Sequence, residues 1–269
     1  MLDQALDFRA ESDVFFALLD SLEEHDWSRT TQFKDWTIND VLAHIHLGNY
    51  LADLSLQDSR AFLDFIRAFG RTGKKGASRL AATHEWLDGL CNRALLQRWR
   101  EFYTAMADRF ADADPKLRVK WVGPDMSVRS SISARLMETW AHAQAVYDVL
   151  GKQRSATDRL KNVAVIGINT FGWTFRNRDL PVPADPPYVR LDAPSGEVWE
   201  WNPPQDENAV RGQALEFCQV VTQVRNIADT SLQVRGDTAQ SWMSIAQCFA
   251  GPPENPPAPG TRFRQVGHP

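Results

Sequence analysis

The chain has 269 residues, a formal net charge of −4 and 43% hydrophobic residues. A chain of this size can bury a substantial core and is long enough for one large or two ordinary domains. The slightly acidic balance lacks the basic footprint of a nucleic-acid-binding or polybasic membrane-binding protein. No apolar run approaches the roughly 20 residues that span a bilayer, and the first residues lack the basic start of a signal peptide. We therefore expect a cytoplasmic protein.

The three cysteines are widely spaced, and none belongs to a CxxC pair: Cys91, Cys218 and Cys248. This spacing favours buried free thiols over a disulfide framework or a thiolate metal site. The composition does not fix the oligomeric state and is compatible with a homodimer.

Hydrophobic residues at helical spacing predict amphipathic helices through the first half of the chain. The second of these helices follows Thr37 and Asp40, which form a capping-box-like pattern. Residues 70–76 are rich in glycine and positive charge, which predicts a solvated loop. The expected helices cover residues 3–24, 38–54, a short stretch after 58, 83–112 and 131–150, with a short extended segment at 117–122.

The helix at 131–150 carries the first candidate metal ligands. Ser130 or Ser131 is its expected N-cap, and Gly151 its expected C-terminal stop. Glu138 and His142 are four residues apart, so on a helix they share one face. Two such side chains can bind one metal ion, and imidazole and carboxylate ligands with one open position are typical of a catalytic zinc site. A solvent-facing ion pair and a histidine with satisfied hydrogen bonds in the core are the alternatives for this spacing.

A third ligand is expected from the helix at 38–54, which contains His44 and His46. These two side chains are about 200° apart around the helix axis, so both cannot face the same interior point. The helix is apolar over a wide arc, and periodicity alone leaves either histidine as the candidate.

The second half of the chain mixes helices with short strands. A helix is expected at 156–176, a hairpin at 188–191 and 197–201, further strands at 208–212 and 231–236, and helices at 213–225 and 238–250. The expected fold class is α+β and mostly helical. It comprises a four-helix bundle at 1–153, a small α+β domain at 154–251 and a Pro-rich tail at 252–269.

Several stretches resemble a known family. Residues 35–44, which run from Asp35 and Trp36 to His44, and residues 137–142, which hold Glu138 and His142, resemble the DinB-like metal-binding bundles. Within these bundles the chain is most similar to the mycothiol-dependent maleylpyruvate isomerase family. Its second half resembles the second domain of that family at 193–199, 210–212 and 234–237. Residues 135–142, 177–183 and 246–253 resemble a metal-binding subgroup of the family.

The resemblance implies a metal site formed by His44, Glu138 and His142, and it selects His44 over His46. It also implies that an arginine of the second domain points at the site, and Arg225 occupies the matching position, where its guanidinium would suit a substrate carboxylate. A helix-capping role is the alternative for this arginine. Family members often carry an acidic residue three positions after the second histidine, where this chain has Ala145.

We interpret the sequence as that of a metal-dependent enzyme, with Zn²⁺ as the expected ion and mycothiol or glutathione as a candidate cosubstrate. The leading hypothesis is a thiol-assisted isomerase or S-transferase acting on a small electrophile, with Glu138 as ligand and proton shuttle and Arg225 as substrate anchor. The alternatives are a thiol-independent metal-dependent isomerase, cyclase or hydrolase, and a non-catalytic metal-containing binding protein. Asn49 and Trp173 are further candidate substrate contacts, although core packing is the commoner role of a tryptophan.

Overall fold

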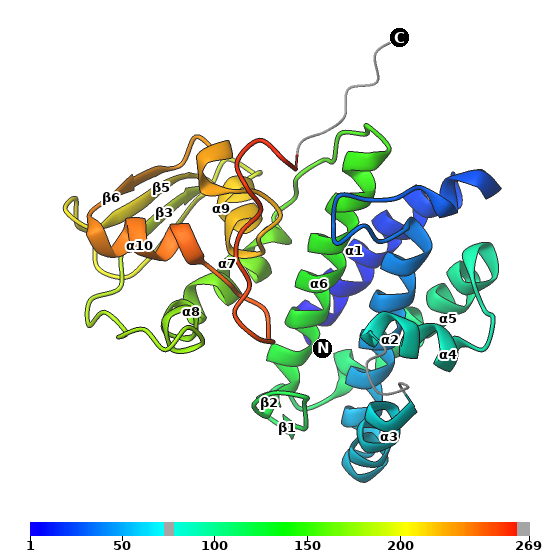
Figure 1. Cartoon of the computed structure of the whole chain (residues 1–269). Helices are drawn as coiled ribbons and strands as arrows, with labels where there is room; N and C mark the ends of the chain where they lie inside the picture. Colours follow the sequence, from blue (N-terminus) through cyan, green and yellow to red (C-terminus); the bar gives the residue numbers. More distant parts are fainter. Residues whose placement is uncertain (73–77, 263–269) are drawn as a thin grey trace. The chain divides into compact units, whose positions relative to one another are not determined.

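A computed structural model describes residues 1–72 and 78–262 of the chain. These residues form two compact units, the first Met1–Val149 and the second beginning at Leu150 (Figure 1). Among the described helices, none is both long enough and apolar enough to cross a bilayer. Part of the predicted loop at 70–76, and the end of the predicted tail from residue 263 onward, lie outside the described residues.

The first unit is a four-helix bundle, as the sequence predicts. Within it, α1 and α2 each pack against both α5 and α6 (Figure 1). The bundle helices are α1 (Asp3–Asp20), α2 (Ile38–Gln57), α5 (Asn92–Asp112) and α6 (Val128–Val149). The other elements of this unit are η1 (Glu24–Ser28), α3 (Ser59–Thr72), α4 (Arg79–Leu87), β1 (Arg118–Val119) and β2 (Met126–Ser127).

The bundle is held together by large apolar side chains that point between the helices. Phe8 and Phe15 of α1, Trp99 of α5 and Leu136 of α6 are all fully buried. Burying side chains of this size contributes roughly 1.5–3 kcal/mol each, which makes this core the main source of stability for the unit.

The start of α2 follows the predicted capping box. The hydroxyl of Thr37 accepts a hydrogen bond from the backbone N–H of Asp40 at 3.1 Å, and the Asp40 carboxylate accepts one from the Thr37 N–H at 2.9 Å. Both interactions satisfy N–H groups that would otherwise lack a partner at the helix end. The capping box therefore fixes where α2 begins, and with it the direction in which its histidines point.

Two expectations for the bundle helices are wrong. The single helix predicted at 83–112 is interrupted between α4 and α5, where Asp88 (φ 48°), Gly89 (φ 83°) and Asn92 (φ 49°) adopt left-handed conformations that end one helix before the next begins. Helix α6 begins at Val128, earlier than expected. Its cap is Ser127, whose hydroxyl accepts from the N–H of Ser130 at 3.1 Å, rather than Ser130 or Ser131.

The second unit contains a four-stranded sheet in the order β4-β3-β5-β6, with β3 parallel to β5 and the outer pairs antiparallel. The predicted hairpin is present as β3 and β4. Helix α9 packs on β3, β5 and α7. The elements are α7 (Leu160–Asn169), α8 (Phe171–Arg176), β3 (Tyr188–Asp192), β4 (Val198–Trp201), β5 (Ala209–Gln213), α9 (Ala214–Val221), η2 (Ile227–Asp229), β6 (Gln233–Arg235) and α10 (Asp237–Ile245).

The helices of this unit are shorter than expected. The helix predicted at 156–176 is divided at Thr170, which leaves helical geometry (φ −95°, ψ 9°) while its hydroxyl donates to the carbonyl of Ile166 at 2.8 Å. The helix predicted at 213–225 stops at Val221, two residues before Gln223 adopts a left-handed conformation (φ 57°).

All three cysteines are free, and Cys218 and Cys248 are buried as expected. Cys91 is exposed, contrary to the expectation. It directly precedes α5, in the turn between α4 and α5, where the chain is at the surface.

Candidate metal centre

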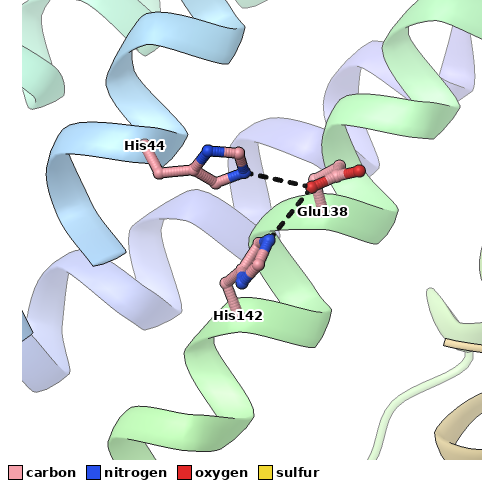
Figure 2. A group of neighbouring side chains, drawn as sticks. All are labelled: His44, Glu138 and His142. Carbon is pink, nitrogen blue, oxygen red and sulfur yellow. Dashed lines mark hydrogen bonds and ion pairs between the residues drawn. The ribbon is translucent and has the colours of Figure 1, made fainter. Parts of the chain in front are cut away.

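Two helices of the bundle bring three potential metal ligands together. His44 extends from α2 toward α6, where Glu138 and His142 lie one helical turn apart (Figure 2). The Glu138 Oε2 atom is 3.1 Å from His142 Nε2 and 3.4 Å from His44 Nε2. One donor atom from each residue falls within 4.8 Å of the other two. The structure places His44, rather than His46, beside the pair on α6.

The spacing of these donor atoms suits a divalent cation. Tetrahedral ligands at zinc-like bond lengths are separated by about 3.4 Å, which is close to both distances to Glu138. The side chains of His44, Glu138 and His142 keep 21%, 22% and 12% of their exposure, so a small molecule can reach the cluster. The three donors fit a catalytic type of site, with three protein ligands and one open position.

The protonation states of these residues also suit metal binding. Burial lowers the pKa of His44 to about 4, so its imidazole is neutral near pH 7 and offers a lone pair. Burial alone would raise the pKa of the Glu138 carboxyl. Hydrogen bonds from His142 and His44, together with the charge of Arg135, outweigh this effect and hold that pKa well below its usual range. A neutral imidazole and an ionised carboxylate are the ligand forms that metals bind.

Two aromatic rings from the loop before α2 pack against the histidines. The ring of Phe33 lies 4.8 Å from that of His142, and the ring of Trp36 lies 5.3 Å from that of His44. The loop is closed by a hydrogen bond from the Thr31 N–H to the Trp36 carbonyl at 2.8 Å. Trp36 thus lies beside His44. These apolar rings limit how far each imidazole can turn.

His46 points to a different environment. It is buried, and its ring packs 5.6 Å from Trp86 and 5.4 Å from Phe102. Tyr50 belongs to the same aromatic group, with its ring 5.1 Å from that of Trp86. Neither residue joins the cluster of His44, so the two histidines of α2 have different surroundings.

Comparison with known proteins supports the assignment of the bundle. Residues 8–147, more than half of the chain, match the family model described as the mycothiol maleylpyruvate isomerase N-terminal domain. The chain belongs to this family. Two uncharacterised proteins of Mycobacterium tuberculosis, from strains CDC 1551 / Oshkosh and ATCC 25618 / H37Rv, are each 36% identical over 247 residues. These residues cover 92% of this chain and 95% of each relative.

The fold of this member of the mycothiol maleylpyruvate isomerase family is also found in solved structures. The crystal structure of the mycothiol-dependent maleylpyruvate isomerase aligns with 81% of this chain and 87% of its own, with a TM-score of 0.51 and 17% identity. The structure of a histidine-to-alanine mutant of that enzyme aligns over the same shares with a TM-score of 0.50. At this level of identity the likeness establishes a shared fold.

The remaining candidate site residues of this family member have defined surroundings. Asn49 is fully buried on α2, and its side-chain oxygen accepts a hydrogen bond from Arg135 Nε at 3.1 Å. Arg225, in the second unit, is 9% exposed and donates from Nη1 to the carbonyl of Val224 at 3.0 Å. Trp173, in the same unit, donates from its indole N–H to the carbonyl of Phe249 at 3.4 Å. Their contacts with a substrate stay a prediction.

Sequence reasoning did not single out Arg135 and Phe33. Arg135 precedes Glu138 by three residues and is 4% exposed, although arginine is rarely buried. One signal was present in the sequence: Gly48 stands inside an otherwise strongly helical stretch, where glycine costs about 1 kcal/mol relative to alanine. A glycine at such a position indicates that another group approaches the backbone closely, and that group is Arg135.

Proposed function

We propose that this protein is a metal-dependent enzyme, a thiol-assisted isomerase or S-transferase that acts on a small electrophilic substrate bearing a carboxylate. Its metal, Zn²⁺ in this proposal, is held by His44, Glu138 and His142. The observation that carries the proposal is the convergence of these three donor atoms within 4.8 Å, in forms that metals bind and with access from solvent. Membership of the mycothiol maleylpyruvate isomerase family supports the use of a low-molecular-weight thiol such as mycothiol or glutathione.

The proposed reaction needs a thiolate beside an activated carbon–carbon double bond. A divalent cation bound at this site would supply the positive charge that lowers the pKa of a thiol. In the reaction, the thiolate sulfur adds to one carbon of the double bond, which becomes a single bond and can rotate. The carbon–sulfur bond then breaks as the double bond re-forms, and the thiol is recovered unchanged. An S-transferase would instead retain the carbon–sulfur bond after a proton is added to the neighbouring carbon.

The side chains of the chain bind and orient the reactants. Glu138 is assigned as ligand and proton shuttle, because its carboxylate already accepts contacts from two imidazoles. Arg225 is retained as the anchor for a substrate carboxylate, with Asn49 and Trp173 as further substrate contacts. The assignment of Arg225 rests on the family resemblance, and that of Trp173 rests on the expectation that a tryptophan lines an apolar pocket.

A second candidate function is a thiol-independent, metal-dependent isomerase, cyclase or hydrolase. Ala145 favours this alternative, because family members often have an acidic residue there, and outer carboxylates orient and tune ligand histidines. A non-catalytic metal-containing protein is the remaining outcome.

Metal analysis of the purified protein tests the site itself. We expect about one equivalent of metal in the wild type and less than a tenth of that in His44→Ala, Glu138→Gln and His142→Ala. His46→Gln is the matched control, since His46 lies two residues from His44 but packs against Trp86 and Phe102. Equal metal contents in the wild type and the three ligand variants, all folded by circular dichroism, would reject the site.

Calorimetric titration with mycothiol, glutathione and bacillithiol separates the two catalytic candidates. The thiol-assisted reaction predicts binding of at least one thiol to the metal-loaded protein, and loss of that binding after metal is removed with a chelator. Metal-loaded protein that binds none of these thiols supports the thiol-independent alternative. Thiol binding of equal strength before and after metal removal contradicts both the proposed chemistry and the role assigned to Glu138.

A further inference from the structure

A buried arginine lies next to the candidate metal ligands with much of its hydrogen-bonding capacity unused. Arg135 is 4% exposed, and its Nε donates to the side-chain oxygen of Asn49 at 3.1 Å. Its Nη2 atom and the Asn49 Nδ2 atom are both enclosed and have no partner among the described residues. Buried polar groups are nearly always paired, so two orphaned donors on side chains that are hydrogen-bonded to each other indicate a bound acceptor.

The position of this guanidinium is fixed by the backbone of α2. A Cβ atom at Gly48 would lie 2.4 Å from Arg135 Nη2, 2.6 Å from Cζ and 2.8 Å from Nη1, so only glycine leaves room for it. Gly48 follows His44 by one helical turn, and Arg135 precedes Glu138 by nearly one turn. The guanidinium and the Asn49 amide therefore occupy the layer of the bundle next to the metal ligands.

The charges in this layer favour an anion. No carboxylate of the described residues forms an ion pair with Arg135 within 4.0 Å. The charge of Arg135 is nevertheless close enough to contribute to the lowered pKa of both His44 and Glu138. The nearby charge of Glu138 favours the charged form of Arg135, while Arg79 contributes a second positive charge. The carboxylate of Glu138 is committed to two imidazoles. A buried cation is costly when its neighbouring carboxylate, here Glu138, is shared with two imidazoles, and a carboxylate of a bound ligand would accept hydrogen bonds from the orphaned donors.

We propose that Arg135 and Asn49 form an anion subsite in the bundle core, which binds a carboxylate of the substrate next to the metal ligands. This inference deepens the proposed function and rests on it for the identity of the ligand as substrate. The subsite is distinct from the predicted anchor Arg225, which belongs to the other unit.

The test uses succinate as the probe and its neutral diamide, succinamide, as the uncharged control, titrated calorimetrically into metal-loaded and chelator-treated protein. The informative variant is Asn49→Asp, which keeps the side-chain shape but supplies Arg135 with an internal carboxylate. We expect it to retain the metal content of the wild type and to melt at the same or a higher temperature, while binding succinate at least tenfold more weakly. Arg135→Lys, which keeps the charge but loses the fork of donors, is expected to weaken succinate binding at least fivefold.

Arg109→Lys is the matched control, because Arg109 also reaches α2 but is already paired with Asp53 through two hydrogen bonds of 2.8 Å. It should bind succinate as the wild type does. Succinate affinity that is unchanged in folded Asn49→Asp, or a wild type that binds succinate no better than succinamide, overturns the subsite. The metal site has a separate readout. If metal-free wild type binds succinate and metal-free Asn49→Asp does not, the subsite is supported even if metal analysis rejects the metal centre.

Discussion

Replacing Gly48 with alanine tests the close contact between α2 and the Arg135 guanidinium. In an ordinary helix interior this change stabilises the folded state by about 1 kcal/mol. Here the new Cβ would overlap three atoms of the guanidinium, at 2.4, 2.6 and 2.8 Å. The guanidinium must move, and its buried hydrogen bond to Asn49 is lost, which costs about 1.5–3 kcal/mol for a charged donor. With the strain of the displaced side chain, we expect a net destabilisation of about 1–2 kcal/mol.

The assay is thermal unfolding of chelator-treated protein, followed by circular dichroism. For a unit of about this size, 1 kcal/mol shifts the melting temperature by roughly 2–4 °C, so Gly48→Ala should lower it by roughly 2–8 °C. Gly70→Ala is the control, because a Cβ at this helical position meets no other atom within 4 Å. It should leave the melting temperature unchanged or raise it slightly.

A second comparison isolates the cause. In an Arg135→Ala background the obstruction is absent, so adding Gly48→Ala should no longer destabilise the protein. The reasoning is refuted if Gly48→Ala melts at or above the temperature of Gly70→Ala, or if its effect is the same with and without Arg135.

Three further changes probe other parts of the chain. Thr37→Ala removes one half of the capping box of α2 and should destabilise the first unit by about 0.5–2 kcal/mol, measured by urea unfolding. Gly236→Ala should destabilise the second unit by more than 1 kcal/mol in the same assay, because Gly236 has a φ of 88° and its Cβ would lie 2.3 Å from the Glu207 carbonyl oxygen. Iodoacetamide should modify Cys91 within minutes and leave Cys218 intact in the native protein, since burial raises the pKa of the Cys218 thiol well above its usual range; peptide mass spectrometry checks this.

The pair on α6 could be predicted because helix geometry alone decides it. Glu138 and His142 are four residues apart, and any uninterrupted helix places them on one face. The third ligand depends on packing between helices. His44 and His46 lie on a helix that is apolar over a wide arc, and only the positions of Trp86 and Phe102 show which histidine turns away from α6. The family resemblance, rather than the periodicity, distinguished them.

The break in the helix predicted at 83–112 could not be read from the apolar pattern. Apolar periodicity continues across residues 83–112, while the break there depends on left-handed conformations at Asp88 and Asn92, which are uncommon for residues other than glycine. Burial of Arg135 was signalled only indirectly, by Gly48, because a charged residue on a helix is normally expected to face solvent. The glycine that accommodates it is 87 positions earlier in the chain, so no local window contains both partners.

The three donors of the proposed metal site come together only when α2 and α6 are correctly aligned. Because one imidazole comes from α2 and two groups come from α6, a slip of either helix by a single residue would rotate its contribution by about 100° and dismantle the whole triad at once. Under the proposed function, the metal content of the purified protein would therefore report whether the two helices are correctly aligned. Chains in which the two helices are misaligned would bind no metal, and they could be separated from correctly folded chains by this difference in metal content.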